Sequence, residues 1–229
     1  MFIQKSAGFL LVVALVTLSA PVARASVLIN EIFADPPAGL SGDANLDGVR
    51  SGTQDEFVEL MNFGTGEADV SFWSLSDSIA VRHTFPSNTV LAPKAFLVVF
   101  GGGAPVLPGV NWQVASSGSL GLNNGGDTVR LADVSQQVID QMIYGNIADQ
   151  DQSITRYPDG EGTEFILHTE LSQANGALFS PGTGLNPIIV ETIPEEEPVG
   201  NPVVPELPTL IYFGMGWGSL LWSRGRRSI

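Results

Sequence analysis

The chain has 229 residues, no cysteine and a formal net charge of -14, with 44% hydrophobic and 15% charged residues. So many apolar residues argue against a disordered acidic tail, and the lack of cysteine excludes disulfides, thiolate metal sites and a cysteine nucleophile. The 26 glycines and 15 prolines disfavour a helical bundle and favour short strands joined by turns.

Residues 1–25 have the pattern of a secretory signal peptide. Lys5 precedes an apolar run over residues 8–18, and Ala23-Arg24-Ala25 supplies the small side chains that a signal peptidase accepts. A retained membrane anchor is the alternative, but the apolar run is short and a small-residue cleavage site follows it. We therefore expect export, with cleavage before Ser26.

Strand-like segments separated by turn residues follow in chain order. The expected strands are residues 26–33, 56–62, 70–75, 80–85, 95–100, 128–132, 138–144 and 153–157. Glycine and asparagine between them supply the positive φ angles that tight turns need. Residues 56–62 have the period of two that is expected of a half-buried strand. Eight short strands without helical spacing predict an all-β sandwich or barrel, with no helix longer than two turns outside the terminal signals.

An ordered series of motifs in these segments resembles the lamin tail domain of secreted bacterial proteins. The motifs are LINEI (28–32), EFVELMN (56–62), VSFWSLSD (70–77), FP (85–86), VLAP (90–93), FLVV (96–99), GDTVRL (126–131), SITRYPDG (153–160) and SPGT (180–183). The resemblance spans residues 26–186 and implies an immunoglobulin-like β-sandwich, with Trp73 and Leu75 as core residues. That length is ample for one sandwich core.

The clearest chemical signal lies between the first two expected strands. Asp43, Asn45 and Asp47 place oxygen atoms at alternate positions, and Gly48 permits the sharp turn that makes them converge. This is the first half of an EF-hand-type calcium loop, which also needs a main-chain carbonyl, here that of Val49. No flanking helices are expected, so the loop would be a similar ligand arrangement inserted into a β-domain.

The end of this loop departs from the EF-hand pattern. Gln54 stands where a bidentate glutamate is expected, so Asp55, Glu56 or water would have to complete the ligand shell. The predicted Ca²⁺ ligands are Asp43, Asn45, Asp47, Val49, Asp55 and Glu56. The alternative is an Asx-rich surface turn whose carboxylates are solvated. Glu31 and Glu59 lie on the neighbouring strands and could lean toward the same edge as the loop, but we expect solvent-facing carboxylates.

Catalytic motifs are poorly represented in the sequence. The chain has two histidines, His83 and His168, and neither lies in a Gly-x-Ser-x-Gly or His-Glu-x-x-His motif. A hydrolase that joins one of them to Asp140 or Glu164 is conceivable, but no spacing fixes such a geometry. We expect structural or surface histidines. Residues 101–103, three glycines, lack the Lys-Ser/Thr of a phosphate loop and are expected to form a turn.

The composition changes at residue 187. Residues 187–208 carry aperiodic prolines and three consecutive glutamates, which favour an extended, self-repelling linker. Residues 209–229 contain the apolar run TLIYFGMGWGSLLW and then three arginines, a stop-transfer pattern with the arginines on the cytoplasmic side. A helix over those 14 apolar residues is roughly 21 Å long, short of the roughly 30 Å hydrocarbon core, so it suits a temporary anchor.

This C-terminal layout resembles the PEP-CTERM sorting signal of bacterial exported proteins. Val204-Pro205-Glu206 precedes the short apolar segment and the terminal arginine cluster, although Leu207 intervenes before Pro208 where the usual motif has proline directly after glutamate. The resemblance implies an exosortase-like sorting enzyme as a partner. It also implies at least transient anchoring in the inner membrane by a C-terminal helix.

Charge narrows the choice of partners. All 24 acidic residues lie between Glu31 and Glu206, but five of the ten basic residues lie in the terminal signals, which leaves a net charge of -19 on the expected exported portion. Nucleic-acid binding requires the opposite sign. The sequence therefore predicts a non-enzymatic binding or structural module at the cell surface or in the extracellular matrix, with calcium, polysaccharide or cell-surface components as partners. The alternative is a secreted hydrolase of nuclease or phosphoesterase type, or an accessory domain of one.

Overall fold

The computed structural model describes residues 26–158 and 162–184, all within a compact unit that ends at Ile188. The expected signal peptide (1–25), the linker (187–208) and the anchor (209–229) lie outside the described residues. Within the two described ranges, no helix has both the length and the apolar character needed to cross a membrane.

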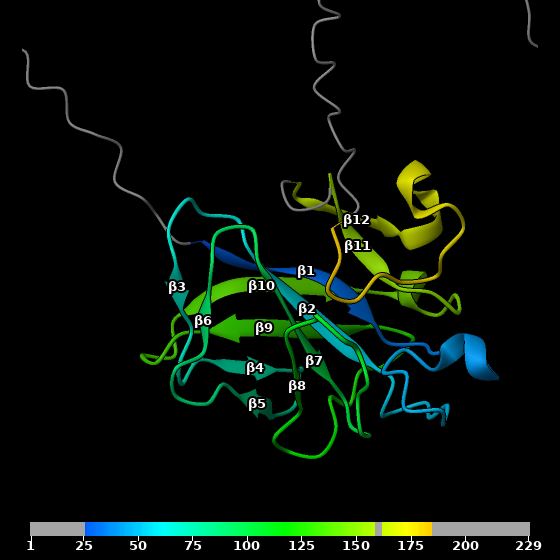
Figure 1. Ribbon diagram of the computed structural model, residues 1–229, viewed down its shortest axis with the longest axis horizontal. Helices are drawn as coiled ribbons and strands as arrows, with labels where there is room; N and C mark the ends of the chain where they lie inside the picture. Colours follow the sequence, from blue (N-terminus) through cyan, green and yellow to red (C-terminus); the bar gives the residue numbers. More distant parts are fainter. Residues whose placement is uncertain (1–25, 159–161, 185–229) are drawn as a thin grey trace, which may run out of the picture. The chain divides into compact units, whose positions relative to one another are not determined.

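Three β-sheets make up the described part of the chain (Figure 1). The largest has the order β12-β11-β1-β2-β7-β8, the second β10-β9-β4-β5, and the smallest pairs β3 with β6. Among the described strands, every pairing is antiparallel apart from that of β7 with β8. The strands are β1 (Val27–Phe33), β2 (Phe57–Asn62), β3 (Ala68–Asp69), β4 (Ser74–Ser76), β5 (Val81–Thr84), β6 (Val90–Leu91), β7 (Phe96–Phe100), β8 (Trp112–Val114), β9 (Asp127–Ala132), β10 (Val138–Tyr144), β11 (Ile154–Tyr157) and β12 (Glu164–Leu167).

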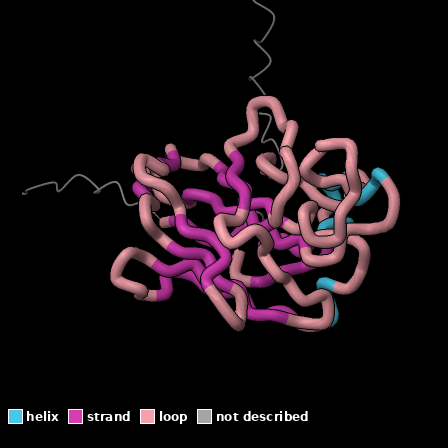
Figure 2. The backbone as a smooth tube through the Cα atoms, turned by 90° about the horizontal axis from the view of Figure 1, so that it is seen from below, coloured by secondary structure: helices cyan, strands magenta, loops and turns pink. Residues whose placement is uncertain are grey.

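Helical structure in the described residues is limited to four turns of 3₁₀ helix. They are η1 (Leu40–Gly42), η2 (Asn146–Ala148), η3 (His168–Glu170) and η4 (Ser172–Ala174). All four lie toward the same end of the strands, on the right of Figures 1 and 2. The expectation of an all-β domain without long helices is therefore confirmed over these residues.

The main hydrophobic core lies between the six-stranded and the four-stranded sheet. Ile29 and Leu60 of the larger sheet join the same buried cluster as Leu75 and Leu131 of the smaller one, and each is at most 1% exposed. Trp73 packs against this cluster and is partly buried. Two sheets closed over one apolar interior form a β-sandwich, as the sequence predicts.

The outer face of the six-stranded sheet is also covered, which the sequence does not predict. All six residues of β2 are buried, so the expectation of a half-buried strand is wrong. Val58 and Leu60 face the main core, whereas Phe57 belongs to a second apolar cluster with Phe33 and Phe100. Ala44 and Leu107 also belong to this cluster, and Phe179 packs against it. These three come from segments outside the sheet, and those segments bury its second face.

The expected strands are present, but one begins later than predicted and four short strands were not predicted. Residues 70–75 were expected as one strand, whereas β4 begins only at Ser74. The preceding residues form a turn, in which the Trp73 amide donates to the Val70 carbonyl and Phe72 has a φ of 64°. β3, β6, β8 and β12 have no counterpart among the expected strands. Each has two to four residues, too few for a period of two to be recognised.

Candidate functional site

The acidic loop, residues 43–56, follows η1 and leads into β2. Its first half curls as the sequence predicts. The amide of Gly48 donates to Asp43 Oδ2 at 2.9 Å, and the amide of Asp47 donates to Asn45 Oδ1 at 3.0 Å. The amide of Val49 donates to Asp47 Oδ1 at 2.9 Å. Gly48 has a φ of 87°, the left-handed conformation that lets the chain turn sharply after the third polar side chain.

Asp55 closes the loop from its other end. Its Oδ1 accepts the amide of Asn45 at 3.2 Å, and its Oδ2 accepts the amide of Ser51 at 2.6 Å. Burial raises the pKa of the Asp55 carboxyl, and the negative charges of Asp43 and Asp47 raise it further, while the two amide hydrogen bonds act in the opposite direction. Three carboxyl groups therefore lie close enough to repel one another.

The three glycines after β7 form the surface on which the acidic loop rests. The amide of Gly101 donates to the Glu56 carbonyl at 2.7 Å, and the amide of Gly102 donates to the Gln54 carbonyl at 3.1 Å. From the loop, Asn45 Nδ2 donates to the Gly102 carbonyl at 3.3 Å. A Cβ atom at Gly101 would collide with the main-chain oxygen of Thr53. The glycine run is therefore a close backbone contact, beyond the simple turn expected from the sequence.

The predicted calcium ligands separate into two groups. Asp43, Asn45, Asp47 and Asp55 gather in the loop through the hydrogen bonds given above. Glu56 instead accepts the amide of Leu122 at 3.3 Å through Oε2, and burial raises the pKa of its carboxyl to about 8.

Val49, the sixth predicted ligand, is exposed. Over residues 26–158 and 162–184, no three His, Asp or Glu side chains form a cluster that could hold a metal ion by themselves. A metal in the loop would therefore need amide and main-chain oxygens as well.

Glu31 and Glu59 contradict the expectation that they face solvent. They are 1% and 0% exposed, and they lie directly opposite each other on β1 and β2. Their side chains point to the outer face of the six-stranded sheet, the face that carries Phe57 and Phe33. They are buried because the segment 177–183, the C-terminal clasp, crosses over them.

The first glutamate is surrounded by hydroxyl and amide donors. Ser153 Oγ donates to Glu31 Oε1 at 2.5 Å, the amide of Ser180 donates to the same oxygen at 3.0 Å, and Ser180 Oγ donates to Oε2 at 3.0 Å. Burial raises the pKa of the Glu31 carboxyl, while the nearby imidazole of His168 and these hydrogen bonds lower it. Glu31 thus ties the clasp to its own strand and to Ser153, the residue before β11.

The second glutamate holds the next part of the clasp. Glu59 Oε2 accepts the amide of Gly182 at 2.6 Å, and Glu59 Oε1 accepts Asn30 Nδ2 at 2.9 Å. Both carboxylates therefore bind the main chain of a segment more than 120 positions away in the sequence. Charge-assisted hydrogen bonds of this kind are stronger than neutral ones.

His168 also binds the clasp, although it lies outside it in the sequence. Its Nδ1 donates to the Ala177 carbonyl at 2.7 Å, its Nε2 lies 2.9 Å from Ser180 Oγ, and the same nitrogen lies 3.9 Å from Glu31 Oε1. The imidazole is fully buried. A hydroxyl, an imidazole and a carboxylate are thus in contact, an association that sequence spacing did not reveal.

His83 is a structural residue on the other sheet. Its Nε2 lies 2.7 Å from Gln113 Oε1, its Nδ1 accepts the amide of Ser116 at 3.2 Å, and its ring packs edge-on against Phe85. Burial lowers the pKa of the His83 imidazole. Asp140, the carboxylate considered as a catalytic partner, instead binds Arg156 Nη2 at 2.8 Å.

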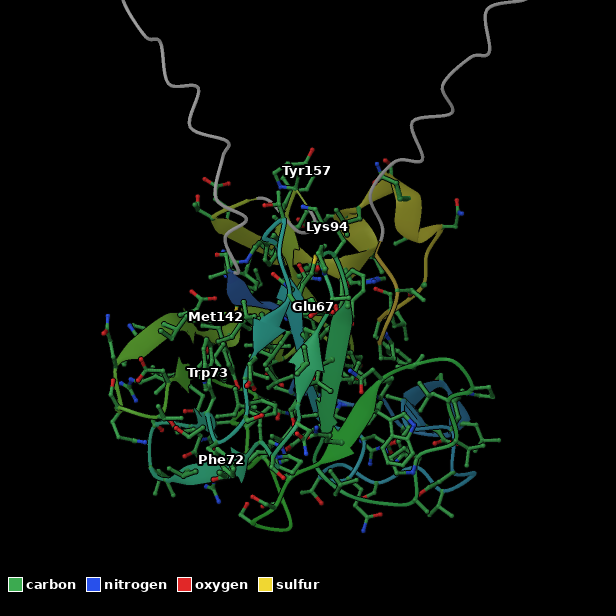
Figure 3. The ribbon with its side chains drawn as sticks, turned by 60° about the vertical axis from the view of Figure 1, so that its left-hand side comes forward. Glu67, Phe72, Trp73, Lys94, Met142 and Tyr157 are labelled. Carbon is green, nitrogen blue, oxygen red and sulfur yellow. The ribbon has the colours of Figure 1, made fainter. Side chains whose placement is uncertain are left out.

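A pocket of about 580 Å³ opens at the start of β1, and none of its lining residues belongs to the acidic loop. Trp73 (Figure 3) and Ile139 provide apolar walls, and Asp69 and Thr65 provide polar groups. The remaining lining residues are Ser26, Val27, Gly64 and Ala68. Trp73 therefore has two environments, the core predicted for it and a solvent-accessible cavity.

The family model for the lamin tail domain matches residues 20–146, more than half of the chain. No curated protein matches the chain. The match ends before β11 and β12, yet both strands extend the sheet that contains β1 and β2. Lamin tail domains are immunoglobulin-like modules and are generally non-catalytic. The fold and the family match agree, and the chain belongs to the lamin tail domain family.

Proposed function

We propose that this protein is an exported module at the cell surface or in the extracellular matrix, with a binding or structural role and no catalytic activity of its own. One observation carries the proposal. The cluster of His168, Glu31 and Ser180 is the part of the described chain that most resembles a catalytic site, and its members are bonded to one another and to the clasp. They serve to fasten a segment over the sheet.

The geometry of this cluster differs from that of a serine hydrolase. In such an enzyme one imidazole nitrogen faces the serine and a carboxylate holds the other. Here Nδ1 of His168 is bonded to a main-chain carbonyl, and Glu31 lies on the Nε2 side, where it accepts the Ser180 hydroxyl itself. The hydroxyl is thus directed to a carboxylate, and the imidazole has no exposed edge for a substrate.

Export and anchoring are supported by the terminal sequences. The small-residue site before Ser26 supports release by a signal peptidase, and the arginine-capped apolar run after Pro208 supports transient insertion in the inner membrane. An exosortase-like enzyme is the proposed partner at this end. Mass spectrometry of the protein isolated from its native cells tests both points: a mature N-terminus at Ser26 and a shortened C-terminus are expected, whereas an intact chain would refute them.

The pocket beside Trp73 supports a neutral extracellular polymer, such as a polysaccharide, as the bound partner. Its lining combines an indole and other apolar groups with a few polar ones, the usual make-up of a ligand site. The excess of acidic residues disfavours nucleic acid.

The rival function, a secreted hydrolase, is favoured by the 2.9 Å contact between Ser180 Oγ and His168 Nε2. The deciding experiment incubates the purified chain with nucleic acids, phosphoesters and polysaccharides. We expect no turnover. Turnover that is lost in Ser180→Ala but kept in the matched variant Ser172→Ala, whose serine is exposed, would establish the hydrolase instead.

A further inference from the structure

We infer that the acidic loop is a calcium site centred on Asp43, Asn45 and Asp47. The observation that points to a bound ligand is one buried carboxylate oxygen that lacks a hydrogen-bond partner. Asp43 is 6% exposed, its Oδ2 accepts the Gly48 amide, and its Oδ1 is buried without a hydrogen-bond partner. A buried carboxylate oxygen without a partner costs free energy, and a bound cation removes that cost.

The charges around this oxygen also call for a cation. Asp43, Asp47 and Asp55 lie in one loop, and none of the ion pairs within the described residues involves them. Arg50, the basic residue of the loop, turns away and donates to the carbonyls of Pro36 and Pro37. The three carboxyl groups thus share one loop without an ion-pair partner among the described residues to balance their charge.

The donors in the loop match calcium better than other common metals. Asn45 Oδ1 and both carboxylate oxygens of Asp47 accept one amide hydrogen bond each and keep a second lone pair. All are hard oxygen atoms held on a short, curled segment. Zinc prefers imidazole or thiolate, whereas calcium takes six to eight oxygens in flexible geometry.

The loop already has its curled conformation, so binding needs little rearrangement. The Asp55 carboxylate holds it by accepting the amides of Asn45 and Ser51, and the glycine run holds it through main-chain hydrogen bonds. Because three carboxylates do not converge on one point, amide, main-chain and water oxygens must complete the shell. Such a site is weak, in the range of about 10⁻⁴–10⁻³ M that is typical of extracellular modules. Calcium fills the site in the cell only if the protein is exported as proposed, whereas calcium binding by the purified chain does not depend on export.

The test uses the purified full chain after removal of metal with a chelator. Calorimetry with calcium chloride should show binding at one site, and the melting temperature should rise with calcium concentration, more than with magnesium. Asp43→Asn should weaken calcium binding at least tenfold. Asp133→Asn is the matched control, because the Asp133 carboxylate, like that of Asp43, accepts a main-chain amide from a few residues ahead, but Asp133 lies in the turn between β9 and β10.

Two results would overturn the inference. One is the absence of both heat and thermal stabilisation in the parent chain up to about 10 mM calcium, ten times the weak end of the expected range. The other is equal calcium affinity in the parent and in Asp43→Asn. If Asp43→Asn does not fold, Asp47→Asn provides the same comparison, since Asp47 is less buried. Either failure would leave the export and turnover experiments unaffected.

Discussion

A methyl group added at Gly101 tests whether the glycine run supports the acidic loop. A Cβ atom there would lie 1.9 Å from the main-chain oxygen of Thr53 and 3.5 Å from the Cβ atom of Glu56. Ordinary contacts between such atoms are about 3.5–4.0 Å. The obstacle is main chain, which cannot rotate aside as a flexible side chain would, so the loop must move away from Gly101→Ala.

The cost of that movement has two parts. Overpacking in a close-packed region costs about 1–3 kcal/mol. Moving the loop also weakens the hydrogen bonds from Gly101 to the Glu56 carbonyl and from Gly102 to the Gln54 carbonyl, each worth about 1 kcal/mol. We therefore expect Gly101→Ala to lower the free energy of unfolding by about 3 kcal/mol. For a domain of this size, the melting temperature should fall by roughly 6–12 °C.

Urea unfolding of the purified chain measures the loss of free energy. Gly125→Ala is the control, because a Cβ atom at Gly125 has no neighbour within 4 Å. It should change the free energy of unfolding by less than about 0.5 kcal/mol. If Gly101→Ala and Gly125→Ala unfold at the same urea concentration, the acidic loop does not rest on the glycine run as described.

Three further predictions concern the pH dependence, the clasp and the core. Burial raises the pKa of Glu56 in the folded state to about 8, above its ordinary 4.5, so its contribution to stability is full below pH 4.5 and is lost as the pH rises to 8. The melting temperature should therefore fall less steeply between pH 5 and 8 in Glu56→Gln than in the parent chain, and equal slopes would contradict this. Ser180→Ala leaves a buried carboxylate oxygen and an imidazole nitrogen short of a partner and should cost about 1–3 kcal/mol in urea unfolding, against less than about 0.5 for Ser172→Ala. Leu75→Ala should cost about 2–5 kcal/mol by the same assay; a change as small as that of Ile79→Ala, at a side chain that is 78% exposed, would place Leu75 outside the core.

The strands that the sequence predicted well are those with clear local signals at both ends. β10 begins and ends where it was expected, because turn residues precede it and Gly145 follows it. The segment 70–75 looks like a β-strand by composition, yet its first half is a turn. Phe72 adopts a left-handed conformation there, and its amide donates to the Phe85 carbonyl. That bond comes from tertiary structure, which residue propensities do not contain.

The same distinction between local and distant contacts separates the two parts of the candidate site. The curl from Asp43 to Gly48 was predictable, because its hydrogen bonds join residues two to five positions apart. The burial of Glu31 and Glu59 was not, because the clasp that covers them comes from residues 149 and 123 positions later in the chain. A carboxylate on a strand is usually exposed, and no pattern near Glu31 or Glu59 shows that a distant serine and glycine will bond to them.

The acidic loop and the clasp are linked because they cover the same face of the six-stranded sheet. Ala44, next to Asp43 with its unpartnered Oδ1 atom, belongs to the apolar cluster of Phe33 and Phe57. Phe179, next to Ser180 in the clasp, packs against Phe33 with the two tilted rings' centroids 4.7 Å apart. The two segments thus share a packing partner, and loosening one exposes apolar surface of the other. A cation that binds only the folded loop would therefore also stabilise the packing of the clasp, because both segments cover the same aromatic cluster.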